Sequence, residues 1–465
     1  MSNLYVIACL LLLAGCSKSE FLSENPNRSQ IVPTTLDDFQ AILDRDIEMN
    51  GVGSTARGPV PGIGEAASDS YYVTDADFNG MLQPQIQNYY LWAAEPYVGD
   101  AVYDWDYPYL VIFSANVVLK GLENLAPTST DVRQYNMVKG QAHFHRAHAY
   151  FQLAQIFAPP YHKGNLTGKW GLPLRLEADL NEPVKRATLQ ETYNLILNDL
   201  SAARELLAAD IQVKTRASKQ AAFALLARTY LIMQEYESAY TYADSCLQLM
   251  GNLLDYNEIN AELSYPFVAG SQEHREVIFS CNMISRPLMS YPFRPTFARV
   301  DSVLYASYDE HDLRKKVFFN QEENGVSFKG SYDGREYNFA GLASDEVYLI
   351  RAEAAARLGN TEQALNDLNR LKAARWEKNV AFQPYSATSQ EEALAYVLAE
   401  RKKELLFRGL RWSDLRRLNL EGRAISIERM IDGKMYALLP NDPRYTYPIP
   451  NEVIAFHPDM PQNER

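Results

Sequence analysis

The sequence predicts a mainly α-helical protein in which antiparallel helix pairs form a scaffold and a loop-rich, variable lobe contains short strands. Three observations favour this fold. Apolar residues recur at helical spacing over several long stretches. Two of these stretches place small residues where paired helices must approach closely. Two other segments of the chain lack this spacing and are rich in residues typical of loops or in aromatic residues. The chain has 465 residues, of which 47% are hydrophobic and 22% charged, a balance typical of globular proteins and not of disordered ones.

The first residues are expected to be a signal peptide. Leu4 to Ala14 form an uncharged apolar run that is about half as long as a membrane-spanning helix. The run ends in Leu13-Ala14-Gly15-Cys16, the pattern of a bacterial lipobox. We therefore predict that residues 1–15 are removed and that Cys16 becomes a lipid-carrying N-terminus, which anchors the chain to a membrane without spanning it. An ordinary secretory signal with an incidental cysteine is the alternative.

Four helices are predicted in the region 131–250. The first has helical periodicity up to the break at Pro159-Pro160. The second begins at Thr188, because Glu191 follows three residues later and completes a capping box. The four predicted helices span residues 131–158, 188–209, 217–233 and 236–250.

The last two of these helices carry the pattern of a tetratricopeptide repeat. Small side chains let two antiparallel helices approach closely, and a tyrosine fills the groove between them. The repeat positions are Leu226, Ala227, Tyr230, Ala239, Ala243 and Cys246. A weaker copy runs over residues 348–375 with Gly359 at the turn, and a further helix is expected over 390–407; both belong to the C-terminal region 344–465.

Two segments lack helical periodicity. Residues 251–343 contain short apolar runs such as Val277-Ile278-Phe279 and are predicted to be loops with short strands. The second spans roughly 51–106. It overlaps residues 58–119, called the acidic segment here, which contain eight acidic residues and no Lys or Arg, against a net charge of −13 for the chain. Eleven of its aromatic residues fall within 71–109. We interpret the acidic segment as a surface that repels anions and presents flat aromatic rings. The net charge of the whole chain argues against nucleic acid as a ligand.

The basic residues of the C-terminal region are expected to form salt bridges within the chain, with a separate anion site as the alternative. They are Arg401, Lys402, Lys403, Arg408, Arg411, Arg416, Arg417 and Arg423.

Three stretches together resemble the SusD/RagB family of Bacteroidetes outer-membrane lipoproteins. Residues 400–417, which include Glu400-Arg401-Lys402-Lys403-Glu404-Leu405 and Arg411-Trp412, are similar to the family's characteristic helix and turn. Tyr447-Pro448-Ile449-Pro450 with Gln462-Asn463 is similar to its closing motif, and Arg351-Ala352-Glu353-Ala354 to its repeat helix.

The resemblance implies a SusD-like α/α fold over residues 16–465. It also implies a lipoprotein on the exterior face of the outer membrane, which captures oligosaccharides, or peptides in some members, and hands them to a SusC-like TonB-dependent barrel. Catalysis and cofactors are not part of this expectation.

Candidate ligand-binding residues follow from the chemistry of sugars, whose C–H faces pack on aromatic rings while their hydroxyls need polar partners. The candidates are Trp92, Tyr71, Tyr72, Phe78, Tyr291 and Phe293. Trp105, Tyr109, Trp376 and Trp412 are expected to be packing residues. Because the acidic segment has no cation, we expect a neutral or partly cationic ligand.

Metal sites have weaker support. Asp75, Asp77 and Asn79 resemble the first half of a calcium loop, but Ile86 stands where the last ligand is needed, so a turn with solvated acids is favoured. His143, His145 and His148 share a helix without further ligands and are expected on its surface. Cys246 lies on an apolar helix face, which favours a buried free thiol over a disulfide with Cys281.

The sequence therefore predicts a non-catalytic binding protein. It contains no phosphate-binding loop, dinucleotide-binding fingerprint, zinc-protease motif or nucleophile elbow. Three alternatives stay open: a peptide-binding member of the same family, a repeat-based interaction scaffold without a small ligand, and a glycoside hydrolase with paired carboxylates.

Overall fold

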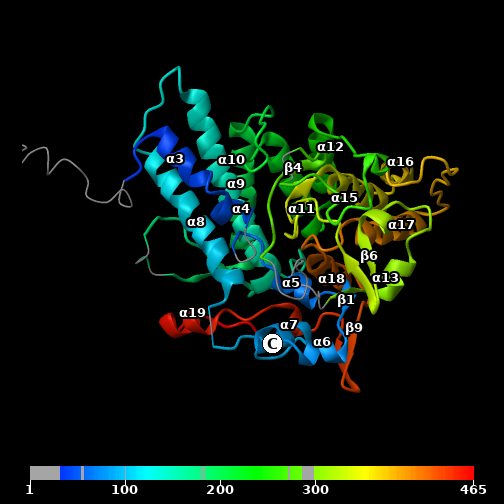
Figure 1. The fold of residues 1–465 in the computed structure, drawn as a ribbon. Helices are drawn as coiled ribbons and strands as arrows, with labels where there is room; N and C mark the ends of the chain where they lie inside the picture. The colour runs from blue at the N-terminus through cyan, green and yellow to red at the C-terminus, as the bar shows by residue number, and fades with distance from the viewer. Residues whose placement is uncertain are drawn as a thin grey trace, which may run out of the picture.

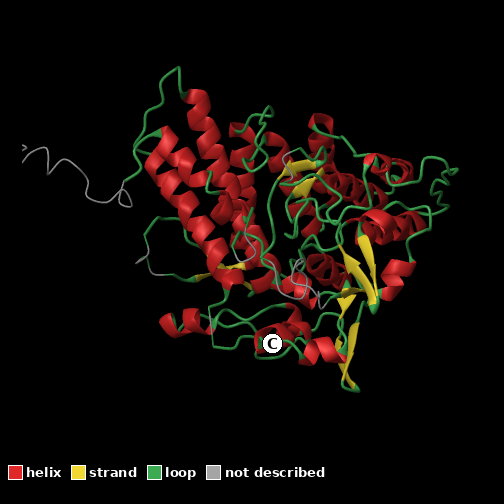
Figure 2. Cartoon of the chain, in the orientation of Figure 1, coloured by secondary structure: helices red, strands yellow, loops and turns green. Residues whose placement is uncertain are grey.

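The computed structural model describes residues 32–53, 57–99, 101–179, 182, 184–270, 273–284 and 298–465. Helices form most of its regular structure, and the strands occur in short pairs (Figure 2). The prediction of a mainly α-helical fold is confirmed. Cys16, Tyr291 and Phe293 lie outside the described residues.

Long antiparallel helices form the N-terminal half (Figure 1). Gly121 marks the closest approach between two of them, since a Cβ atom there would lie 2.1 Å from the ring of Phe39. The second long helix ends before Pro159-Pro160, and the third begins with the predicted capping box of Thr188 and Glu191. The helices are α3 (Leu36–Leu43), α4 (Asp46–Asn50), α8 (Tyr103–Leu122), α9 (Val132–Phe157) and α10 (Leu189–Leu206).

The repeat helices lie beside this group and agree with the predicted positions (Figure 1). Ala227, Ala239, Ala243 and Cys246 are fully buried between the first pair, as close helix packing requires. Gly359 has a φ of +84° in the turn of the second pair. The pairs are α11 (Lys219–Ile232) with α12 (Tyr236–Leu249), and α15 (Ser344–Arg357) with α16 (Thr361–Ala373), followed by α17 (Gln390–Glu404) and α18 (Arg411–Leu420).

Strands and short helices fill the predicted loop-rich region. Val277-Ile278-Phe279 forms a buried strand, as predicted. The antiparallel pairs are β1 (Tyr71–Tyr72) with β5 (Arg299–Val300), β2 (Trp170–Pro173) with β3 (Arg186–Thr188), β4 (Val277–Phe279) with β8 (Leu342–Ala343), β6 (Phe319–Glu322) with β7 (Gly325–Phe328), and β9 (Ile427–Ile431) with β10 (Lys434–Leu438). Short helices are α13 (Ser302–Ala306) and α14 (Arg314–Val317), and the 3₁₀ turns are η2 (Tyr256–Glu258) and η3 (Pro443–Tyr445).

Residues 63–90 of the acidic segment include three short helices and lie near the C-terminal residues in the lower part of Figure 1, whereas the end of the segment belongs to α8. The chain end contacts the acidic segment, since Arg465 donates through Nε to the Ala93 carbonyl at 2.9 Å. Asn463 donates through Nδ2 to the carbonyls of Phe157 (2.8 Å) and Tyr447 (2.7 Å). The predicted closing motif therefore ties the end of α9 to the C-terminus. The short helices here are α5 (Ile63–Ala67), α6 (Asp75–Asn79), α7 (Pro84–Tyr90) and α19 (Asn451–Phe456).

Candidate ligand-binding site

A groove of about 410 Å³ lies beside β1, called the Tyr72 groove here. Tyr72 is 38% exposed, and its backbone is held opposite Arg299 in the β1–β5 pair. The groove combines a flat ring with charged and polar groups, the lining that a sugar requires. Its lining residues are Asp69, Tyr71, Tyr72, Val73, Tyr90, Asp301, Lys402, Ser426, Ile427, Glu428, Arg429 and Met430.

Tyr71 lines the same groove, but most of its side chain is buried in the core. Its hydroxyl donates to the carbonyl of Ala66 at 2.6 Å, and its ring packs against Tyr90 and Phe407. Burial raises the pKa of Tyr71 far above the ordinary value. Tyr71 therefore supports the groove while Tyr72 supplies the exposed ring.

The prediction that Trp92 and Phe78 lie on the surface is wrong. Trp92 is 1% exposed, its indole N–H donates to the Ala67 carbonyl at 2.9 Å, and the guanidinium of Arg429 lies 4.5 Å from its ring centre. Phe78 is buried against Tyr90. Both rings are part of the main hydrophobic core, so neither offers a free face to a ligand.

The prediction of a cation-free surface is also wrong, because cations from distant parts of the chain reach the acidic segment. Asp69 accepts from Arg411 at 2.6 Å and from Lys402 at 2.8 Å, and these partners hold the pKa of its carboxyl well below the ordinary value despite burial. Arg429 donates to the carbonyls of Ser68 and Tyr90. The groove thus carries both signs of charge, and the expectation of a neutral ligand loses its basis.

Two other acids of the acidic segment are buried and accept hydrogen bonds from backbone amides. Asp104 accepts from the amides of Gly62 (2.7 Å) and Ile63 (3.0 Å). Glu65 is 1% exposed and accepts from the Gly409 amide at 3.0 Å; burial raises its pKa to about 7. Their charges are not part of a ligand surface.

The calcium candidates do not converge on a common point. Asp75, Asp77 and Asn79 belong to α6, where Asp77 and Thr74 share a helix cap and Asn79 donates to Asp432. Asp75 accepts from the backbone of Asp432. Both aspartates have a structural partner, so the sequence likeness to a calcium loop reflects a capped helical turn.

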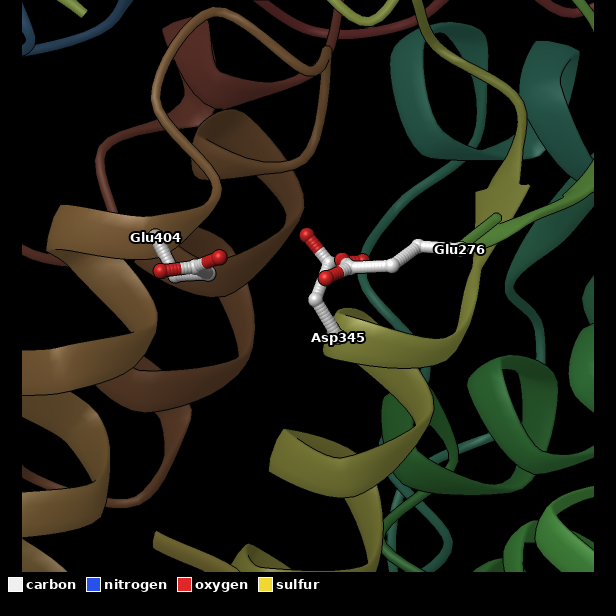
Figure 3. Close-up of side chains that lie close together, drawn as sticks. All are labelled: Glu276, Asp345 and Glu404. Atoms are coloured by element: carbon white, nitrogen blue, oxygen red, sulfur yellow. The ribbon is translucent and has the colours of Figure 1, made fainter. Parts of the chain in front are cut away.

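Three other carboxylates do converge, those of Glu276, Asp345 and Glu404 (Figure 3). Arg375 lies among them and donates to Glu276 at 3.0 Å and to Glu404 at 2.8 Å. Arg408 donates to Asp345 at 3.1 Å. Buried guanidinium groups therefore supply the positive charge that a metal would bring, and the cluster is a structural ion-pair network.

The predicted C-terminal salt-bridge network is confirmed except at Arg416, which donates to the carbonyls of Gln155 and Ala158 instead. Arg417 pairs with Glu353 at 2.8 Å and with Asp414 at 2.9 Å, and Arg401 also pairs with Asp414. Trp105, Trp376 and Trp412 are buried as expected.

The thiol prediction is confirmed as well, whereas the histidine prediction is not. Cys246 and Cys281 are buried and free. His145 and His148 are fully buried rather than on the helix surface, and desolvation lowers the pKa of both, that of His145 to about 4.

An exposed tryptophan escaped the sequence-based selection. Trp170 is 44% exposed, whereas the other four tryptophans are at most 8% exposed. It lies at the start of β2 and lines a second cavity of about 370 Å³. Its position in the non-periodic stretch between Pro159-Pro160 and the capped α10 is the signal that could have identified it.

Two family models match this chain. Residues 20–231 match a model described as starch-binding, associating with the outer membrane, and residues 331–465 match a model of the SusD family. A relative, SusD-like protein P38 of Formosa agariphila, is 23% identical, with 86% of each chain covered.

Solved structures share the fold. A putative sugar binding protein from Bacteroides vulgatus has a TM-score of 0.75 at 23% identity, covering 93% of this chain and 99% of that chain. A SusD superfamily protein from the same species has a TM-score of 0.75 at 21% identity, with the same coverage. Within the described part of the chain, no helix combines the length and apolarity needed to cross a membrane.

Proposed function

The chain belongs to the SusD/RagB family, and from this premise we propose that it captures oligosaccharides at an outer-membrane surface and delivers them to a SusC-like TonB-dependent transporter. In this proposal the protein is a lipoprotein anchored through Cys16 and facing the exterior. It holds its ligand without covalent chemistry, and affinity is moderate because the ligand must move on.

The observation that carries this proposal is the Tyr72 groove. Tyr72 presents an exposed ring at the edge of a concave surface. Asp301 and Glu428 add carboxylates, and Lys402 adds an ammonium group that Asp69 already neutralises. Hydroxyls both donate and accept hydrogen bonds, so a lining of both kinds suits a sugar chain. Tyr291 and Phe293 remain candidates from the sequence alone.

The alternatives differ in what they bind. A peptide-binding protein would also use an aromatic groove, an interaction scaffold would bind no small ligand, and a hydrolase would cleave the oligomer. Two acids near the groove have structural roles: Asp69 is paired with two cations, and Glu65 is buried. Neither is available for the paired acid and base roles of glycoside hydrolysis.

Isothermal calorimetry with a panel of neutral and acidic oligosaccharides and of short peptides tests the proposal. Tyr72→Ala should weaken oligosaccharide binding about tenfold, since a lost ring contact costs about 1.4 kcal/mol. Tyr103→Ala is the matched control, because Tyr103 is 46% exposed but does not line the groove. The recovered oligosaccharide should be intact by chromatography. Binding of peptides only, binding of neither class, or shortened products would each overturn the proposal in favour of one alternative.

A further inference from the structure

The second cavity, called the Trp170 cavity here, shares no lining residue with the Tyr72 groove. It holds about 370 Å³ of space, enough for one or two sugar rings by the usual size of ligand pockets. Its walls come from the loop after α9, the start of β2, the C-terminal half of α18 and the chain around η3. The lining includes Pro159, Pro160, Trp170, Arg416, Asn419 and Tyr445.

Trp170 is held rigidly although its ring is exposed. Its backbone pairs with Thr188 across the β2–β3 ladder, and the next residue, Gly171, lies so close to α10 that a Cβ atom would be 2.1 Å from Thr192 Oγ1. The amide of Leu189 donates to the carbonyl of Lys169 at 2.9 Å. A large apolar ring fixed in this exposed position costs free energy that burial would recover, so a flat partner stabilises it.

The opposite wall is built as firmly. Asn441 donates to the carbonyl of Asn419 at 3.2 Å, and Asn419 donates to Tyr445 at 3.4 Å. Arg186 donates to the Pro461 carbonyl at 2.8 Å. The cavity is thus preformed by hydrogen bonds among segments far apart in the sequence. The protein therefore loses little conformational entropy when a ligand binds there.

Arg416 lines this cavity and is anchored within the protein. Its side chain is 3% exposed, and its two terminal nitrogens donate to the carbonyls of Gln155 and Ala158. The cavity is also lined by the polar side chains of Asn419, Asn441 and Gln462. A polar wall and an exposed indole together supply the two kinds of contact that a hydroxylated ring makes.

We propose that the Trp170 cavity is a second carbohydrate site, which takes one or two pyranose rings of the oligosaccharide by stacking on Trp170. The proposal rests on the proposed function for the ligand class, but it concerns a different surface. Two separate sites on one chain hold a long oligomer more firmly than either site alone, and each site can still release it quickly.

Intrinsic tryptophan fluorescence tests the proposal directly, because Trp170 is exposed and the other four tryptophans are buried. Titration with maltohexaose, cellohexaose, xylohexaose and hexagalacturonate should shift and enhance the emission with at least one of them. Trp170→Ala should abolish this response, whereas Tyr72→Ala should keep it. The affinity measured by calorimetry should be about tenfold weaker for Trp170→Ala. Trp170→Phe, which keeps a smaller ring, should recover part of the lost affinity.

The possible failures are distinguishable. Oligosaccharide binding that depends on Tyr72, with no change in tryptophan emission and wild-type affinity in Trp170→Ala, overturns the second site and leaves the proposed function standing. A response that Tyr72→Ala also abolishes shows one site and overturns the proposal. Absence of heat and of emission change with every oligosaccharide overturns both. Circular dichroism of each variant verifies that it is folded.

Discussion

Replacing Glu65 with glutamine should remove a pH-dependent part of the protein's stability. Glu65 is 1% exposed and lies where the acidic segment meets the turn after α17. Its carboxylate accepts from the Gly409 amide at 3.0 Å and from Ser68 at 3.2 Å. Glutamine has the shape of the protonated acid, so it can keep an acceptor for Gly409 while carrying no charge.

The sign and size follow from the pKa of Glu65. Burial raises it from an ordinary 4.5 to about 7, because the hydrogen bonds do not compensate for lost hydration. The folded protein therefore holds this proton more tightly than the unfolded chain, so the stabilisation is complete below about pH 4.5 and is lost as the pH rises through about 7. At about 1.4 kcal/mol for each pH unit, the loss is about 3 kcal/mol.

Urea denaturation at about pH 5 and about pH 8 measures the effect. The unfolding free energy of Glu65→Gln minus that of the wild type should rise by about 2–3 kcal/mol between these two conditions. Other titrating groups, such as Glu276, are present in both proteins and cancel in the difference. Glu123→Gln is the control, since its 64% exposed side chain should change the same difference by less than about 0.5 kcal/mol. A difference that does not vary with pH would refute the assignment of Glu65 as a buried acid.

Two further substitutions separate structural from binding roles. Arg375→Met should lower the unfolding free energy by about 3–5 kcal/mol in urea denaturation, because it leaves the buried carboxylate of Glu276 without its cation and removes one of the two guanidinium partners of Glu404. A change below about 1 kcal/mol would contradict this. Trp92→Ala should likewise lower the unfolding free energy by about 3–5 kcal/mol, because its ring is buried. Tyr72→Ala should lower it by less than about 1 kcal/mol in the same urea denaturation, because its ring is exposed. Equal losses for the two variants would contradict the burial of Trp92.

The scaffold was predictable because its signals are local. The capping box of Thr188 and Glu191, the break at Pro159 and the small residues of the repeat pair each act within a few turns of one helix. The α10 boundary and the α11–α12 pair agree with them within a few residues. The free thiol of Cys246 was predictable for the same reason, since its place on an apolar helix face decides its burial.

The binding surface was less predictable because it depends on contacts between distant segments. Nothing near Asp69 in the sequence indicates that Lys402 and Arg411 would neutralise it from more than 300 residues away. Composition also could not tell an aromatic ring that covers a small core from one that faces solvent. Trp92 and Trp170 both occur in loop-like sequence, yet they are 1% and 44% exposed.

These distant contacts also explain how one scaffold can hold a changeable surface. Arg411 and Lys402 hold Asp69, and Arg429 holds the Ser68 carbonyl, so the C-terminal region fixes the floor of the Tyr72 groove. The exposed ring of Tyr72 takes no part in these ion pairs. Substitutions at the rim therefore change ligand contacts at little cost in stability, whereas substitutions among the cations would displace the whole groove.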